Sequence, residues 1–138
     1  MHSKRSLVFT LIIALVVGAT ACMSLAGDCR NQILKQIPSP SGKMKAVVFQ
    51  RDCGATTGFS TQVSVLSSEQ DLPNDGGNIF VADTDPGNAP SGPGGGPVVE
   101  VSWTNETELL VRHDKRARLF HNEPSLANIR IRYETLAP

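Results

Sequence analysis

The chain has few aromatic residues and no excess of either charge. Its 138 residues include one Trp, one Tyr and five Phe, and 13 Lys and Arg are balanced by 13 Asp and Glu. So few aromatic side chains argue against a large aromatic platform for a ligand. The balanced charge argues against nucleic-acid binding, which depends on basic side chains that neutralise phosphates. We therefore expect no nucleic-acid partner.

The chain also lacks the residue patterns of common cofactor sites. Its three histidines and three cysteines do not follow the spacing of a zinc site. The Gly- and Pro-rich segment 83–97 has no following Lys-Ser or Lys-Thr, as a phosphate-binding loop would. Asp83, Asp85 and Asn88 offer oxygen atoms, but the closing Glu of a calcium loop is missing. No metal or other cofactor is predicted, and the segment is expected to be either functional or loosely ordered.

The N-terminus does contain a pattern, that of a secretory signal peptide. Lys4 and Arg5 precede the apolar run 7–17, and small residues follow it up to Cys22. A basic segment, a short apolar helix and small residues, in that order, are typical of an exported protein. The run is too short to span a bilayer comfortably. Removal of residues 1–21 takes away two basic residues and no acidic ones, which leaves a formal net charge of −2.

More than one cleavage site fits the small residues. Ala19-Thr20-Ala21 suits an ordinary cut before Cys22, and the same place resembles a bacterial lipoprotein site, although leucine is usual where Ala19 stands. A later cut after Ala26 would remove Cys22. We favour lipidation of Cys22, with a signal peptide (1–21), a tether (22–30) and one domain (31–138). The protein would then be exported and held at a membrane of the bacterial cell envelope.

After the leader, short apolar stretches alternate with clusters of Gly, Pro, Asn, Asp and Ser, which is typical of an all-β domain. We predict a single antiparallel sheet of about six or seven strands, as a partly closed barrel or a sandwich. Alternation predicts that Val99, Val101 and Trp103 share a buried face. The segment 46–49 is apolar on both faces and is placed in the middle of the sheet, whereas 112–118 is expected to be a solvated basic loop. The predicted strands are 32–37, 43–51, 60–66, 78–82, 98–104, 108–113 and 128–134.

The cysteines predict one disulfide bond. If Cys22 carries the lipid, the exported chain keeps the even pair Cys29 and Cys53. Their midpoint is Ser41, which lies in a turn predicted from Pro40 and Gly42. Residues equally distant from a hairpin turn face each other, at a Cα separation that a disulfide can bridge. We predict that this bond ties the base of the hairpin, and that residues 54–58 connect two strands.

Several stretches resemble a family of small exported bacterial proteins that is catalogued as a domain of unknown function. The stretches are SPSGK (39–43), RDCGATTGFSTQVS (51–64), GPGGGP (92–97), Trp103 and RYE (132–134). The CGATTGFSTQVS motif is the most specific part. The chain departs from the family at Ser41, where aspartate is usual. The resemblance implies a bacterial origin and export, and it supplies no activity, ligand or catalytic residue.

Together these observations predict a non-catalytic envelope lipoprotein with a binding or structural role, and they leave its protein or small-molecule partner open. The alternative is a small secreted hydrolase that uses His113 with Cys53 or a serine such as Ser60 or Ser64. Three points weigh against it. Oxidation would consume the Cys53 thiol, Asp114 would point away from its neighbour His113 on a strand, and neither serine lies in a nucleophile elbow.

Overall fold

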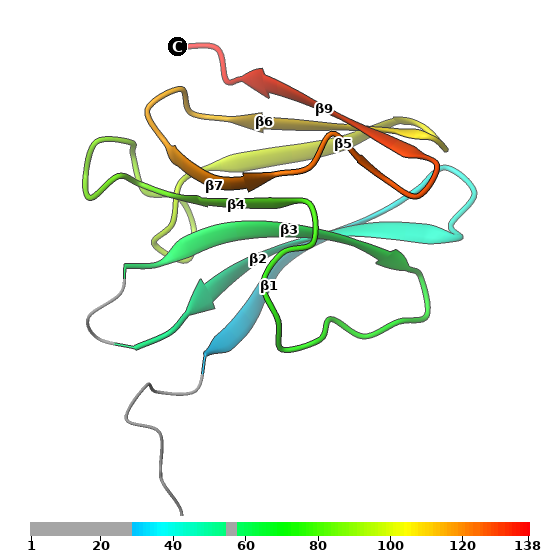
Figure 1. Ribbon diagram of the computed structural model, residues 1–138, viewed down its shortest axis with the longest axis horizontal. Helices are drawn as coiled ribbons and strands as arrows, with labels where there is room; N and C mark the ends of the chain where they lie inside the picture. Colours follow the sequence, from blue (N-terminus) through cyan, green and yellow to red (C-terminus); the bar gives the residue numbers. More distant parts are fainter. Residues whose placement is uncertain (1–28, 55–57) are drawn as a thin grey trace, which may run out of the picture.

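The computed structural model describes residues 29–54 and 58–138, which form two β-sheets and contain no helix (Figure 1). All neighbouring strands are antiparallel except β6 and β9, which are parallel. The five-stranded sheet has the order β1 (Arg30–Pro38), β2 (Met44–Asp52), β3 (Ser60–Ser67), β4 (Phe80–Asp83) and β7 (Arg118–Asn122). The four-stranded sheet has the order β5 (Val99–Asn105), β6 (Glu108–His113), β9 (Ile129–Thr135) and β8 (Ser125–Leu126).

The two sheets stack face to face as a sandwich (Figure 1). Val63 and Phe80 from the first sheet and Leu109, Val111 and Ile131 from the second belong to one buried core. The all-β class is therefore confirmed for the described part of the chain. The prediction of a single sheet is wrong, and these strands form no closed barrel.

Strand β2 is apolar on both faces because both faces are covered. Ala46 and Val48 contribute to the core between the sheets. Val47 and Phe49 alternate with them and point to the outer face, where Leu72 packs against them. Leu72 comes from the long β3–β4 connection, which lies on the side away from the second sheet (Figure 1). The segment 46–49 thus lies in a strand with a neighbour on each side, although β2 is the second strand of the sheet and not its middle one.

Two aromatic side chains tie the sheets together. The Trp103 indole on β5 donates a hydrogen bond of 2.9 Å to the carbonyl oxygen of Ile37 on β1. The Tyr133 hydroxyl on β9 lies 2.9 Å from the carbonyl oxygen of Ile79 and 2.7 Å from that of Glu123, and its single proton serves one of them at a time. Trp103 is partly buried against the core. The prediction that Trp103 is buried is therefore met in part, since its side chain packs against the core without being fully enclosed.

Two strands were missing from the sequence-based assignment. Strands β7 and β8 follow β6 and precede β9, within a region that carries exposed Arg118, Leu119 and Phe120. The register of β7 against β4 shifts near Phe120, which breaks the alternation that reveals a strand in the sequence. Strand β8 has only two residues, too few for any periodic pattern. The turn 114–117 agrees with the basic loop, whereas Arg112 and Arg118 lie in strands.

The Cys29–Cys53 disulfide is present at the base of the β1–β2 hairpin, so this prediction is confirmed. The two Cα atoms lie 4.0 Å apart. The adjacent pair is Arg30 with Asp52, and the pairs continue in step to Ile33 with Phe49. The signal peptide, Cys22 and the tether up to residue 28 lie outside the described residues, and β1 begins at Arg30, within the predicted tether.

Candidate functional site

Five polar residues form a row across the five-stranded sheet. The register pairs Asn31 with Arg51, Arg51 with Ser60, Ser60 with Asp83, and Asp83 with Arg118. Ala82 is the neighbour of Asp83 in β4 and lies in the core between the sheets. Since successive strand residues point to opposite faces, the row lies on the outer face of the sheet.

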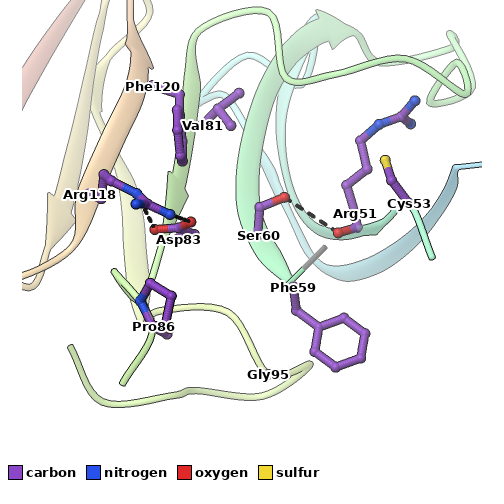
Figure 2. A pocket seen from close by; sticks show the side chains of 12 residues that line it. Arg51, Cys53, Phe59, Ser60, Val81, Asp83, Pro86, Gly95, Arg118 and Phe120 are labelled. Carbon is purple, nitrogen blue, oxygen red and sulfur yellow. Dashed lines mark hydrogen bonds and ion pairs between the residues drawn. The ribbon is translucent and has the colours of Figure 1, made fainter. Parts of the chain in front are cut away.

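A groove with a volume of about 620 Å³ is lined by four residues of this row, Arg51, Ser60, Asp83 and Arg118 (Figure 2). Two aromatic rings in its lining remain open to water, with Phe59 45% exposed and Phe120 60% exposed. In Figure 2, Ser60 lies between Arg51 on one side and the pair of Asp83 and Arg118 on the other. We call this feature the cross-strand groove and define it by Arg51, Phe59, Ser60, Asp83, Arg118 and Phe120.

The Arg118 guanidinium is paired with acids inside the protein. Its Nε and Nη2 atoms donate to the two Asp83 carboxylate oxygens at 3.1 and 2.6 Å, and its Nη1 lies 3.5 Å from an Asp85 oxygen. Burial opposes ionisation of Asp83. The hydrogen bonds from Arg118 and from the Asp85 N–H outweigh it, so the pKa of Asp83 is lowered. The guanidinium also lies over the Phe120 ring, 5.1 Å from its centre.

The Arg51 guanidinium has a different environment, made of amides. Its Nη1 atom donates to the side-chain oxygens of Asn31 and Asn74, at 2.8 and 3.1 Å. The Asn31 amide nitrogen in turn donates to the backbone oxygens of Pro73 and Asp75, at 3.1 and 2.9 Å. Within residues 29–54 and 58–138, no carboxylate forms an ion pair with Arg51.

Gly95, from the Gly-rich segment 92–97, lines the groove, and this segment is folded against the sheet. Gly95 has φ +87°, and a Cβ atom there would lie 2.5 Å from the Phe59 ring. At Gly96, a Cβ atom would lie 2.5 Å from the Thr61 hydroxyl oxygen. That hydroxyl donates to the backbone oxygen of Pro97 at 2.7 Å. The glycines therefore allow a backbone segment to lie directly on β3.

The residues of the alternative catalytic prediction do not converge. Cys53 lines the groove, but its sulfur is bonded to Cys29 and offers no thiol. His113 is buried, with its ring centre 5.7 Å from that of Phe80, and it is not part of the groove lining. The Ser60 hydroxyl oxygen accepts a hydrogen bond from the Gln62 amide at 2.8 Å, and Ser64 accepts one from the Asn78 N–H. Neither serine has a histidine as hydrogen-bond partner in the described chain.

Metal ligation gains no support from the geometry of the chain that the structure describes. No three side chains of His, Cys, Asp or Glu gather there in a way that suits a metal ion. Asp83 and Asp85, which the sequence offered as calcium ligands, instead contact Arg118. Asn88 donates to Asp85 at 3.4 Å.

Sequence reasoning did not find the cross-strand groove. Arg51, Asp83 and Arg118 are far apart in the chain and meet only through the pairing of β2, β3, β4 and β7. The one available signal was the polar residue at the outward position near each strand end. That signal is weak, because outward positions of a sheet are normally polar.

Comparison of the chain with models of protein families, with curated proteins and with solved structures gave no match. The family resemblance carried by the CGATTGFSTQVS motif therefore stays a prediction. No helix in the described part of the chain has the length and apolar character that a membrane crossing requires.

Proposed function

We propose that the protein is an exported lipoprotein of the bacterial cell envelope, anchored through Cys22, whose β-sandwich is a non-catalytic binding module. The observation that carries the binding role is the cross-strand groove. It exposes the Phe59 and Phe120 rings beside charged side chains on a rigid sheet. Water-exposed aromatic rings in a concave site, next to a few fixed polar groups, are typical of ligand-binding surfaces.

Two features support export and anchoring. The order of basic residues, apolar run and small residues before Cys22 is that of a signal peptide. The Cys29–Cys53 bond suits an oxidising compartment, since such bonds are rare where thiols are kept reduced. With these two cysteines paired, Cys22 is the one left over from the three in the chain, as expected for a cysteine with a separate role.

The anchor is tested by the Cys22→Ala variant, expressed with its own leader in a bacterial host and labelled with a radioactive fatty acid. We expect the wild type to be labelled and to sediment with membranes. The variant should be unlabelled and move to the soluble fraction, because it has no site for the lipid. Ser24→Ala, which alters the same segment and keeps Cys22, is the matched control and should behave as the wild type.

Mass spectrometry of the mature protein distinguishes the remaining outcomes. A wild-type N-terminus at lipidated Cys22 supports the anchor. A mature chain that starts at Gly27 would mean export without an anchor, and equal membrane association of wild type and Cys22→Ala would remove the anchor altogether.

A further inference from the structure

A second cavity, with a volume of about 210 Å³, lies between the two sheets. Val48 of β2 belongs to the core between the sheets, Val99 of β5 packs against that core, and both line the cavity. The apolar lining is completed by Leu34, Pro93, Pro97 and Val98. We call this feature the inter-sheet cavity. It shares no lining residue with the cross-strand groove.

The Gly-rich segment 92–97 holds one side of this cavity in place. The Thr61 hydroxyl donates to the backbone oxygen of Pro97 at 2.7 Å, and both residues line the cavity. The segment is also closed on itself, because the Gly92 N–H donates to the backbone oxygen of Gly96 at 2.7 Å. The cavity therefore has a fixed wall in the absence of a ligand, as most ligand sites do.

The size and lining of the cavity limit what it can hold. A cavity of about 150 Å³ with aliphatic walls is enough for a benzene molecule. Pockets for drug-sized ligands are larger, at about 300–1,000 Å³. The hydroxyl proton of Thr61 is already used by the Pro97 backbone. The inter-sheet cavity therefore suits a single apolar group of about the size of one aromatic ring.

Lys35 is the charged residue among the described residues that line this cavity. It pairs directly with Val48 across the β1–β2 ladder. Directly opposed residues project to the same face of a sheet, so the Lys35 side chain leaves β1 on the side of the core between the sheets. Because Lys35 is exposed, its aliphatic stem borders the cavity while its ammonium group reaches water.

The bulge at Leu34 gives Lys35 this position. Ile33 pairs with Phe49, whose side chain points to the outer face, and a regular ladder would pair Lys35 with Val47 on that same outer face. The extra residue Leu34 instead turns Lys35 towards the core side of the sheet. Bulges commonly re-aim a side chain near a functional site.

The charge of Lys35 has no acidic partner in the described chain. Within residues 29–54 and 58–138, no carboxylate forms an ion pair with this lysine. An apolar cavity beside an uncompensated cation is complementary to a molecule that joins an apolar group to an anion.

We propose that the inter-sheet cavity binds a small organic carboxylate. Its apolar group, about the size of an aromatic ring, enters between the sheets, and its carboxylate pairs with the Lys35 ammonium group. This inference goes beyond the binding role proposed above, because it concerns a different site and depends on neither the cross-strand groove nor the anchor.

The test follows side-chain signals by NMR in the purified full mature protein, in a non-ionic detergent at constant pH and ionic strength. Benzoate is titrated up to about 10 mM, a range that detects weak affinities. We expect it to shift the methyl signals of Val48 and Val99 and the side-chain signals of Lys35. Benzyl alcohol has the ring without the charge, and it should shift the same methyl signals with lower affinity. Acetate has the charge without the ring, and it should leave the methyl signals unchanged.

Variants separate the contribution of the charge from that of the cavity. Lys35→Met keeps an apolar stem, so it should weaken benzoate binding by about three- to tenfold and leave the affinity for benzyl alcohol unchanged. Lys45→Met is the matched control and should bind both probes as the wild type does, because Lys45 neighbours Ala46 in β2 and therefore points to the outer face. Val99→Phe should abolish binding of both probes, because the larger side chain fills the cavity.

The inference is overturned if benzoate shifts none of the methyl signals of Val48 and Val99 in the wild type. Equal benzoate affinity of the wild type and Lys35→Met overturns it as well, and Lys35 would then only protect the edge strand β1 from pairing with other strands. Shifts confined to Phe59 and Phe120 would place benzoate in the cross-strand groove, which contradicts this inference and not the binding role proposed above. The wild-type titrations decide even if Val99→Phe does not fold.

Discussion

Loss of the Cys29–Cys53 bond should cost the domain a large part of its stability. The perturbation is the double variant Cys29→Ala/Cys53→Ala, which removes the bond and leaves Cys22 untouched. The bond closes a loop with a sequence separation of 24 residues. In the chain-entropy description of a disulfide, a loop of this length restricts the unfolded chain by about 3.5 kcal/mol near room temperature.

A loss of about 3.5 kcal/mol is large compared with the total free energy of unfolding of a small domain. A domain of this size is typically stable by about 5–15 kcal/mol, so the variant should lose between a quarter and more than half of its free energy of unfolding. The native pairing on either side of the bond survives the substitution, because Arg30 with Asp52 and Asn31 with Arg51 are held by the β1–β2 ladder. We therefore expect the variant to fold, with a strand end that frays more readily.

The assay is urea denaturation followed by tryptophan fluorescence, with and without reductant. For a urea m-value of about 1–3 kcal/mol/M, the midpoint of the double variant should fall by about 1–3.5 M. Reductant should lower the midpoint of the wild type to the same level and leave the variant unchanged. A loss below about 1 kcal/mol, or a wild type that reductant does not affect, would refute the reasoning.

Two further predictions concern the Gly-rich segment 92–97 and an exposed ion pair. Gly96→Ala should destabilise the domain by about 1–3 kcal/mol in urea melts, because the new Cβ atom would lie 2.7 Å from the Thr61 backbone nitrogen. Gly58→Ala is the control and should change the stability little, because a Cβ atom at Gly58 would have no described neighbour within 4 Å. The hydrogen bonds from Arg116 lower the pKa of Asp114 from 3.8 to about 2. The ionised Asp114 carboxylate therefore stabilises the folded state fully above pH 3.8, and this stabilisation is lost as the pH falls towards 2. A carboxyl NMR titration checks the value, and Arg116→Gln should return it towards 3.8; an unchanged pKa in that variant would contradict the assignment of the cause.

Much of the strand layout follows from local sequence patterns. All seven predicted strands correspond to observed ones, because each combines an apolar run with turn residues at its ends. The segment 108–113 was placed at its observed bounds, Glu108–His113. The segment 46–49 revealed its interior position because both faces of β2 are apolar. Period, composition and turn chemistry are local signals, and a sequence carries them directly.

The division into two sheets could not be predicted in this way. Whether β5 pairs with β4 or begins a second sheet depends on how the connection 84–98 folds, and that depends on contacts such as Gly96 with Thr61. The parallel pairing of β6 with β9 likewise needs β7 to cross to the first sheet. Phe120 conceals β7 because its bulge breaks the alternation. Each of these features is set by long-range contacts.

The disulfide prediction was confirmed although the turn is not centred where the sequence placed it. The pairs from Pro38 with Lys45 to Lys35 with Val48 are symmetric about the middle of the Ser41–Gly42 bond, half a residue beyond the predicted centre at Ser41. At that register Cys29 would not face Cys53. Strand β1 then contains one extra residue, Leu34, which shifts all later pairs by one and brings the cysteines into register.

The same shift aligns the candidate site. Asn31 faces Arg51 only because Leu34 is a bulge, and this pairing lets the Asn31 amide oxygen hold the Arg51 guanidinium. The disulfide lies two pairs further along the same ladder, so it fixes the β1–β2 register that pairs Asn31 with Arg51. The covalent bond thus holds the strand pair that carries Asn31 and Arg51. The CGATTGFSTQVS stretch therefore combines two roles, since its cysteine forms the disulfide bond and its Phe59 and Ser60 line the groove.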